Sequence, residues 1–88
     1  MEEMKMKALK KALDSEQIDY TTEYVDGEFL TIPTFNYDIE IFFDEETEKY
    51  TCRTYKIDVI LFKDEEAKNE RYLKSIKAVL NYIDRFYK

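Results

Sequence analysis

Carboxylates are the most concentrated chemically active groups in this chain. The 37 residues from position 12 to position 48 contain no lysine or arginine and hold 12 acidic side chains. Carboxylates at this density can bind divalent cations, transfer protons, or present negative charge to a basic partner. The acids are Asp14, Glu16, Asp19, Glu23, Asp26, Glu28, Asp38, Glu40, Asp44, Glu45, Glu46 and Glu48.

Asp38 and Glu40 have the spacing best suited to metal chemistry. On one face of a strand they would stand about 7 Å apart, because a strand rises ~3.4 Å per residue. With Glu23 they could hold Mg²⁺, as in nucleases whose order of helix, strands and helix resembles this one. That nuclease signature has a lysine two residues after the second acid, where this chain has Phe42. A minimal metal-dependent nuclease is therefore the second alternative; the acids otherwise form a solvated sheet face.

Other catalytic arrangements lack their essential residues. The chain has no histidine and one glycine, which excludes His-dependent triads, His-Cys zinc sites and glycine-rich phosphate loops. The acidic loop from Asp44 to Glu48 lacks the glycine and ligand spacing of an EF-hand. Cys52 has no histidine to activate it and suits a small, half-buried hydrophobic position. We therefore expect no enzyme activity, no metal and no cofactor.

Charge is strongly segregated along the chain. All 14 basic residues and the other 8 acids lie outside the acidic stretch, so the net charge of −6 hides a polarised molecule. With 88 residues, 44 % hydrophobic and 16 % aromatic, the sequence predicts one globular domain over 1–88. A single cysteine and the lack of any long apolar run favour a soluble, cytoplasmic protein that does not bind membranes.

The first half of the chain predicts a helix followed by antiparallel strands. From Glu2 to Asp14, Met6, Leu9 and Leu13 recur at helical spacing. The lysines Lys5, Lys7, Lys10 and Lys11 mostly take the other side and either remain solvated or pair with the acidic sheet. Strands from Tyr20 to Val25 and from Glu28 to Ile32 flank Asp26-Gly27, the signature of a tight two-residue hairpin.

The clearest strand is predicted from Phe35 to Phe43, where apolar and polar residues alternate. A carboxylate loop separates it from a strand region from Lys49 to Phe62, which is either one bent strand or two short ones. Side-chain chemistry also predicts how these strands pair, since apolar residues should face each other and opposite charges should meet. The expected pairs are Ile41 with Cys52, Phe43 with Tyr50, Glu40 with Arg53, and Asp44 with Lys49.

A C-terminal helix is predicted from an N-cap at Asp64, with Glu65 and Glu66 in its first turn. Pairs at i,i+4 spacing are expected from Glu70 to Lys74 and from Asp84 to Lys88. The fold class is therefore α+β: an N-terminal helix, an antiparallel sheet of three to five strands, and a C-terminal helix packed on one sheet face. The expected shared core consists of Tyr37, Ile39, Ile41, Leu73, Ile76, Leu80 and Ile83.

The order of these elements is similar to that of the double-stranded RNA-binding domain. The landmarks that resemble it are Tyr20, Gly27, Pro33-Thr34-Phe35, and Ala67-Lys68-Asn69 near the start of the final helix. Where that family has a basic cluster that grips phosphates, this chain has Asp64-Glu65-Glu66. The resemblance therefore does not imply RNA binding, since phosphate contacts dominate such affinity.

The acidic stretch is better explained as an interface. Its acids lie on predicted strands and turns, and aromatic residues typical of interfaces stand between them. The expected function is a small, acidic, non-enzymatic module that docks on a basic surface of a nucleic-acid-handling protein and binds no nucleic acid directly. Inhibitors encoded by phages, such as anti-CRISPR and anti-restriction proteins that mimic nucleic acid, resemble it in size, charge and lack of catalytic motifs. The first alternative is a structural or assembly homodimer. The expected partner-binding residues are Glu23, Asp26, Glu28, Asp38, Glu40, Phe42, Asp44, Glu45 and Glu46.

Overall fold

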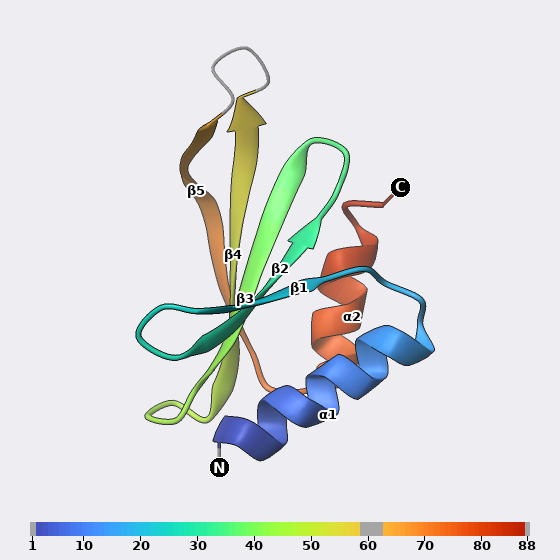
Figure 1. The fold of residues 1–88 in the computed structure, drawn as a ribbon, viewed down its shortest axis with the longest axis vertical. Helices are drawn as coiled ribbons and strands as arrows, with labels where there is room; N and C mark the ends of the chain where they lie inside the picture. The colour runs from blue at the N-terminus through green and yellow to red at the C-terminus, as the bar shows by residue number, and fades with distance from the viewer. Residues whose placement is uncertain (1, 59–62, 88) are drawn as a thin grey trace.

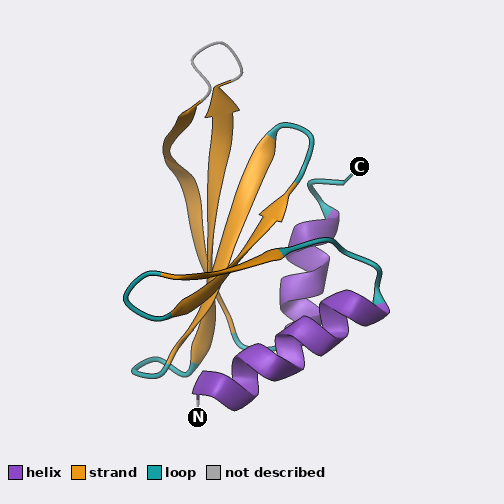
Figure 2. Ribbon diagram, viewed as in Figure 1, coloured by secondary structure: helices purple, strands orange, loops and turns teal. Residues whose placement is uncertain are grey.

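A five-stranded antiparallel sheet, with its strands in chain order, is the centre of the computed structural model, which describes residues 2–58 and 63–87. Both helices pack on the same side of this sheet (Figure 1). The predicted α+β arrangement is confirmed, and Figure 2 shows the helices grouped apart from the strands. The elements are α1 (Glu2–Ser15), β1 (Thr21–Tyr24), β2 (Glu28–Pro33), β3 (Tyr37–Asp44), β4 (Lys49–Asp58), β5 (Lys63–Leu73) and α2 (Ile76–Asp84).

The pairing of β3 with β4 follows the predicted register. In β3 the burial alternates along the strand, so one set of side chains enters the core and the other faces away from it. Strand β4 runs unbroken through Asp58, and the end of the predicted strand region, 59–62, lies outside the described residues. All four predicted pairs occur: Ile41 with Cys52, Phe43 with Tyr50, Glu40 with Arg53, and Asp44 with Lys49.

The turn between β1 and β2 contains three residues instead of the predicted two. Tyr24 pairs with Glu28, so Val25, Asp26 and Gly27 form the connection. Asp26 and Gly27 have φ values of 55° and 123°, in the left-handed region that Gly tolerates best and Asp tolerates better than most residues. The Val25 N–H donates to the Gly27 carbonyl at 3.0 Å. The signal for positive φ was right, and Val25 adds one residue to the turn.

The predicted start of β3 was two residues early. Phe35 belongs to the turn after β2 and is 93 % exposed. The Thr34 hydroxyl closes this turn, because it accepts from the Tyr37 N–H at 3.2 Å and donates to the Tyr37 carbonyl at 2.7 Å. These local bonds hold the backbone in a turn and start the ladder at Tyr37.

The predicted start of the C-terminal helix was wrong. Residues Lys63–Leu73 form β5, which pairs antiparallel with β4, and the helix begins only at Ile76. Ser75 is its N-cap, and the Ser75 hydroxyl accepts from the Ala78 N–H at 3.1 Å. Pairing with β4 outweighs the local preference of this acidic segment for a helix N-terminus, because ladder bonds and side-chain packing decide strand formation.

Several expectations that depended on the longer helix change with it. The i,i+4 pair from Glu70 to Lys74 does not form on a helix, because Glu70 lies in β5. The segment Ala67–Asn69, which resembles an RNA-binding landmark at a helix start, also lies in β5. Lys88, the partner expected for Asp84, lies outside the described residues.

The core lies between the sheet and the two helices. Of the predicted core residues, Ile39, Ile41 and Ile83 are fully buried, and Leu73, Ile76 and Leu80 pack against them partly buried. Tyr37 is half-buried, and its ring lies 5.4 Å from that of Phe86. The predicted apolar face of α1, formed by Met6, Leu9 and Leu13, is completely buried.

Two tyrosine hydroxyls tie the helices to the sheet. In the core, the hydroxyls of Thr54 in β4 and Tyr82 in α2 are 2.6 Å apart. The Tyr50 hydroxyl donates to the Lys5 carbonyl of α1 at 2.9 Å. Polar groups at these positions are therefore paired, as burial requires.

Candidate functional site

The sheet surface turned away from both helices is the candidate binding surface, and we call it the open face. Because side chains alternate along a strand and paired residues share a face, the register defines its members. The open face carries Glu23, Phe29, Thr31, Asp38, Glu40, Phe42, Asp44, Lys49, Thr51, Arg53, Tyr55, Glu70 and Tyr72.

The structure brings together the central residues of the predicted site. Asp38, Glu40 and Phe42 alternate along β3 on the open face. Glu23 lies on the same face in β1, where its carboxylate accepts from the Thr31 hydroxyl at 2.6 Å. These side chains are fixed by strands in the middle and at one edge of the sheet.

The other predicted acids lie at the ends of strands. Asp26 is exposed in the hairpin turn, and Glu45 and Glu46 are exposed in the turn after β3. Asp44 ends β3, and its carboxylate accepts from the Glu46 N–H at 2.9 Å. Asp26 lines a hollow with Glu40 and Phe42 of β3, whereas Glu45 and Glu46 extend the acidic surface at the turn after β3.

Glu28 has a different neighbourhood from the rest of the predicted site. Its carboxylate forms an ion pair with Lys10 of α1, and the Tyr24 hydroxyl donates to it at 3.3 Å. The hydrogen bond to Glu28 raises the pKa of Lys10. Glu28 therefore links α1 to the hairpin. Lys10 pairs with the acidic sheet, which is one of the two roles that the sequence left open for the lysines of this helix.

Arg53 lies in the middle of the acidic surface. Its Nε donates to the Glu70 carboxylate at 2.8 Å, and its guanidinium carbon lies 5.2 Å from the centre of the Phe42 ring. Stacking of guanidinium on an aromatic face is a favourable cation–π contact. Burial raises the pKa of Tyr55, and the nearby Glu40 carboxylate adds to this shift, whereas Arg53 opposes it.

Glu70 and Tyr72 complete this network from β5. The Tyr72 hydroxyl donates to the Glu70 carboxylate. This bond, followed by the one from Arg53, lowers the pKa of Glu70. Sequence reasoning missed both residues because it placed them on the final helix. The available signal was Ser75, an N-cap residue directly before the apolar stripe that begins at Ile76.

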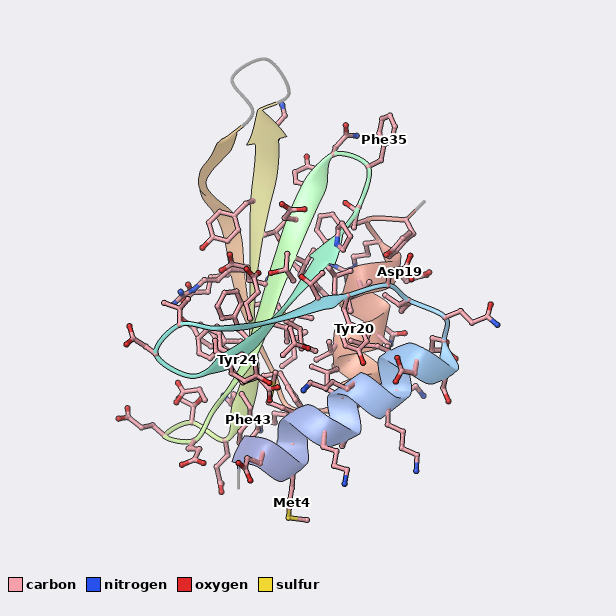
Figure 3. All side chains as sticks on the ribbon, viewed as in Figure 1. Met4, Asp19, Tyr20, Tyr24, Phe35 and Phe43 are labelled. Carbon is pink, nitrogen blue, oxygen red and sulfur yellow. The ribbon has the colours of Figure 1, made fainter. Side chains whose placement is uncertain are left out.

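A hollow of about 310 Å³ lies where the hairpin tip meets the open face. Figure 3 shows Tyr24 on this hairpin, and Phe35 at the far end of the sheet. The hollow is lined by Val25, Asp26, Gly27, Glu28, Phe29, Glu40, Phe42 and Arg53.

Two other sequence hypotheses can be compared with the structure. Among residues 3–56 and 70–87, whose side chains the structure describes, no three acidic or cysteine side chains are grouped so that they could hold a metal ion. Cys52 is completely buried, and burial raises its pKa to about 12, so the thiol stays protonated at neutral pH. It packs as a small hydrophobic residue, more deeply than the half-buried position expected.

In the described part of the chain, no helix has the length and apolar character needed to span a membrane.

Comparisons of the chain with protein-family models, with curated proteins and with solved structures gave no match.

Proposed function

We propose that this chain is a protein-binding module whose open face docks on a basic protein surface. The observation that carries the proposal is the grouping of Asp38, Glu40 and Phe42 on one strand face that neither helix covers. Strand hydrogen bonds hold these residues in place, so docking costs them less conformational entropy than it would cost charges on a mobile tail. Phe42 supplies an apolar anchor between the charges.

The charge balance of the open face favours a cationic partner. The acids Glu23, Asp38, Glu40, Asp44 and Glu70 outnumber the bases Lys49 and Arg53. Arg53 is engaged by Glu70 within the chain. Such a surface attracts a basic groove over a distance of about one Debye length, ~8 Å at physiological ionic strength.

Nucleic-acid-handling proteins are the class of partner whose surface complements this acidic face. Their binding grooves are lined by lysine and arginine side chains that neutralise phosphates. A rigid face with ordered carboxylates can occupy such a groove in place of nucleic acid. The module would therefore act as a competitive inhibitor, as the phage-encoded proteins that it resembles in size and charge do.

Charge reversal on β3 tests the docking face. The double variant Asp38→Lys, Glu40→Lys should bind an octalysine peptide at least about tenfold more weakly than the wild type in calorimetry at 50 mM salt, with a flatter salt dependence. The matched control, Asp14→Lys with Glu16→Lys, changes the net charge equally at exposed positions in the last turn of α1 and in the turn that follows it. Equal losses in both variants would show that only net charge matters, and would contradict the proposal.

Competition with nucleic acid tests the partner class. A protein that the wild type captures, and that the Asp38→Lys, Glu40→Lys variant does not, should be released by duplex DNA or by an RNA oligomer. Release would support occupation of a nucleic-acid groove. A captured protein that nucleic acid does not displace would contradict this part of the proposal.

Each alternative function has a distinct result. A homodimer joined through apolar contacts would persist from 50 mM to 500 mM salt in sedimentation equilibrium, whereas electrostatic docking would weaken. A nuclease would cleave DNA or RNA with Mg²⁺ or Mn²⁺ and would lose this activity in Asp38→Asn. We expect a monomer without cleavage activity.

A further inference from the structure

A second hollow, of about 530 Å³, lies between β5 and α2. Arg71 of β5 pairs with the buried Cys52 of β4, and paired residues share a face of the sheet. This hollow is therefore on the helix-covered side and separate from the open face, and we call it the basic hollow. Its lining residues are Arg71, Leu73, Ala78, Asn81, Tyr82 and Arg85.

Among the described residues, the lining of the basic hollow has two cations and no acid. Arg71 lies on β5, and Arg85 directly follows α2, so the two arginines come from different elements. Both are exposed, and the ion pairs between side chains that the structure describes engage Lys10 and Arg53 instead. Asn81 adds an amide whose N–H groups can donate. The hollow therefore offers positive charge and hydrogen-bond donors to an anion.

The guanidinium of Arg85 is not needed to cap α2. Basic side chains near a helix C-terminus can donate to its last carbonyls. Here the carbonyls of Tyr82, Ile83 and Asp84 already accept from the backbone N–H groups of residues 85–87, at 3.3, 2.9 and 3.2 Å. Asp84 itself lines a different hollow, together with Glu16.

Apolar groups form the remaining wall of the basic hollow. Leu73 is partly buried and packs against the core. Tyr82 is buried, and its hydroxyl is engaged by Thr54 inside the core. Ala78 lies one turn before Tyr82 on α2. We infer that the basic hollow binds a small phosphate monoester that carries an apolar group.

The two arginines favour a phosphate monoester over a carboxylate. A guanidinium fork pairs with two oxygens of one anion, so a carboxylate is satisfied by a single arginine. A phosphate monoester has three terminal oxygens and a charge of about −1.5 to −2 at pH 7, so it can pair with both Arg71 and Arg85. The volume of about 530 Å³ is in the range of ligand pockets and leaves room for the organic group of the ester.

The charge of the whole chain favours a small molecule over a nucleic acid. The net charge is −6, and 12 acids lie between positions 12 and 48. This charge repels a long polyanion, whose phosphates extend beyond the basic hollow. A single phosphate group avoids most of the repulsion, because salt screens it beyond ~8 Å.

Three small anions test the chemistry of the ligand. Phenyl phosphate, inorganic phosphate and benzoate would be titrated into the ¹⁵N-labelled protein in a phosphate-free buffer with 50 mM salt. Phenyl phosphate should shift the amide signals of residues 71–73 and 78–85, with an affinity at least about tenfold that of benzoate. Inorganic phosphate should bind several times more weakly than phenyl phosphate, because it lacks an apolar group. Equal affinities within either pair, or shifts located elsewhere, would overturn the inference.

A double variant tests the two arginines. Arg71→Gln with Arg85→Gln should weaken binding of phenyl phosphate about tenfold, as the loss of two exposed charge pairs does. The matched control, Lys7→Gln with Lys11→Gln, changes the net charge equally at exposed positions on α1 and should keep the wild-type affinity. The same ¹⁵N spectra show whether each variant is folded. Equal losses in both variants, or unchanged affinity in the arginine variant, would contradict the inference.

An oligonucleotide with a 5′-terminal phosphate tests the size of the ligand. At 50 mM salt it should bind no more tightly than phenyl phosphate. Tighter binding would assign the basic hollow to nucleic-acid ends and overturn the small-molecule ligand. None of these results depends on octalysine binding, which concerns the open face, so the docking proposal and this inference can fail separately.

Discussion

The two faces of the sheet have opposite environments, although the same strands form both. On the covered face, Ile39 and Ile41 are completely buried against the helices. On the open face, the alternating residues Asp38, Glu40 and Phe42 are only partly buried. The strand period of two makes this separation possible, because adjacent residues in one strand have different environments. Substitutions on the open face should therefore change its surface chemistry with little loss in the free energy of unfolding.

Two threonines in β4 show the same contrast at the level of single hydroxyl groups. Thr54 on the covered face is fully buried, and its hydroxyl is bonded to that of Tyr82. Thr51 on the open face is 2 % exposed between Phe42 and Tyr72, and its hydroxyl has no hydrogen-bond partner within the described structure. On the face that the helices cover, the Thr54 hydroxyl has a hydrogen-bond partner. On the open face, the Thr51 hydroxyl is buried and has none within the described structure.

Substitution of neighbouring residues in β3 should give the largest difference between the faces. Ile39→Ala removes a fully buried side chain and should lower the free energy of unfolding by about 2 to 5 kcal/mol. Asp38→Ala, one residue away on the open face, should cost under about 1 kcal/mol. Urea denaturation of both variants measures this difference. Similar losses would mean that the open face also carries the fold.

Loss of the core hydrogen bond should have the next largest effect. Tyr82→Phe leaves the buried Thr54 hydroxyl unpaired and should cost about 1 to 3 kcal/mol. Removal of both hydroxyls, in Tyr82→Phe with Thr54→Val, should cost less than the sum of the two single changes. A double-mutant cycle in urea gives the coupling energy. Strict additivity would contradict a direct bond between these groups.

Thr51→Val should stabilise the protein. The substitution keeps the shape of the side chain and removes a buried hydroxyl that is unsatisfied within the described structure, so it should raise the free energy of unfolding by about 1 kcal/mol. Thr54→Val is the matched control and should destabilise, because it leaves the Tyr82 hydroxyl without its partner. A loss of stability in Thr51→Val would show that the Thr51 hydroxyl is satisfied in solution.

The sequence predicts best where local pattern and long-range packing agree. In β3 the alternation of residues fixes which side chains are buried, and the pairing of Glu40 with Arg53 fixes the register with β4. The C-terminal segment was misassigned because Asp64-Glu65-Glu66 is typical of a helix start, whereas its observed strand depends on pairing with the distant β4. Nothing local in Lys63–Leu73 reveals that partner.

The candidate site was likewise predictable where its residues share one strand, and not where they depend on pairing with a distant strand. Asp38, Glu40 and Phe42 share a face because they share a strand, and the sequence predicts that directly. The contribution of Glu70 and Tyr72 depends on β5, so it could not be predicted from a helical assignment. The neutralisation of Glu28 by Lys10 joins residues 18 positions apart, on a helix and a strand whose packing no sequence pattern specifies.

That ion pair gives a pH-dependent difference between the hairpin and the rest of the acidic surface. Because Glu28 raises the pKa of Lys10 above its ordinary value of 10.5, the folded protein holds this proton more tightly than the unfolded chain. The stabilisation is fully present below pH 10.5 and disappears as the pH rises through the folded pKa. Lys10→Met should therefore lower stability by under about 1 kcal/mol at pH 8, since the pair is partly exposed.

The difference between the wild type and Lys10→Met should shrink towards zero as urea midpoints are measured from pH 8 to pH 11. Lys7→Met on the exposed side of α1 is the matched control and should show no such convergence. Charge reversal of Asp38 and Glu40 should preserve this alkaline dependence, because neither residue is a partner in the Lys10–Glu28 ion pair. A pH-independent gap between the wild type and Lys10→Met would mean that Lys10 stabilises α1 through packing alone. In that case Glu28 would return to the acidic surface available for docking.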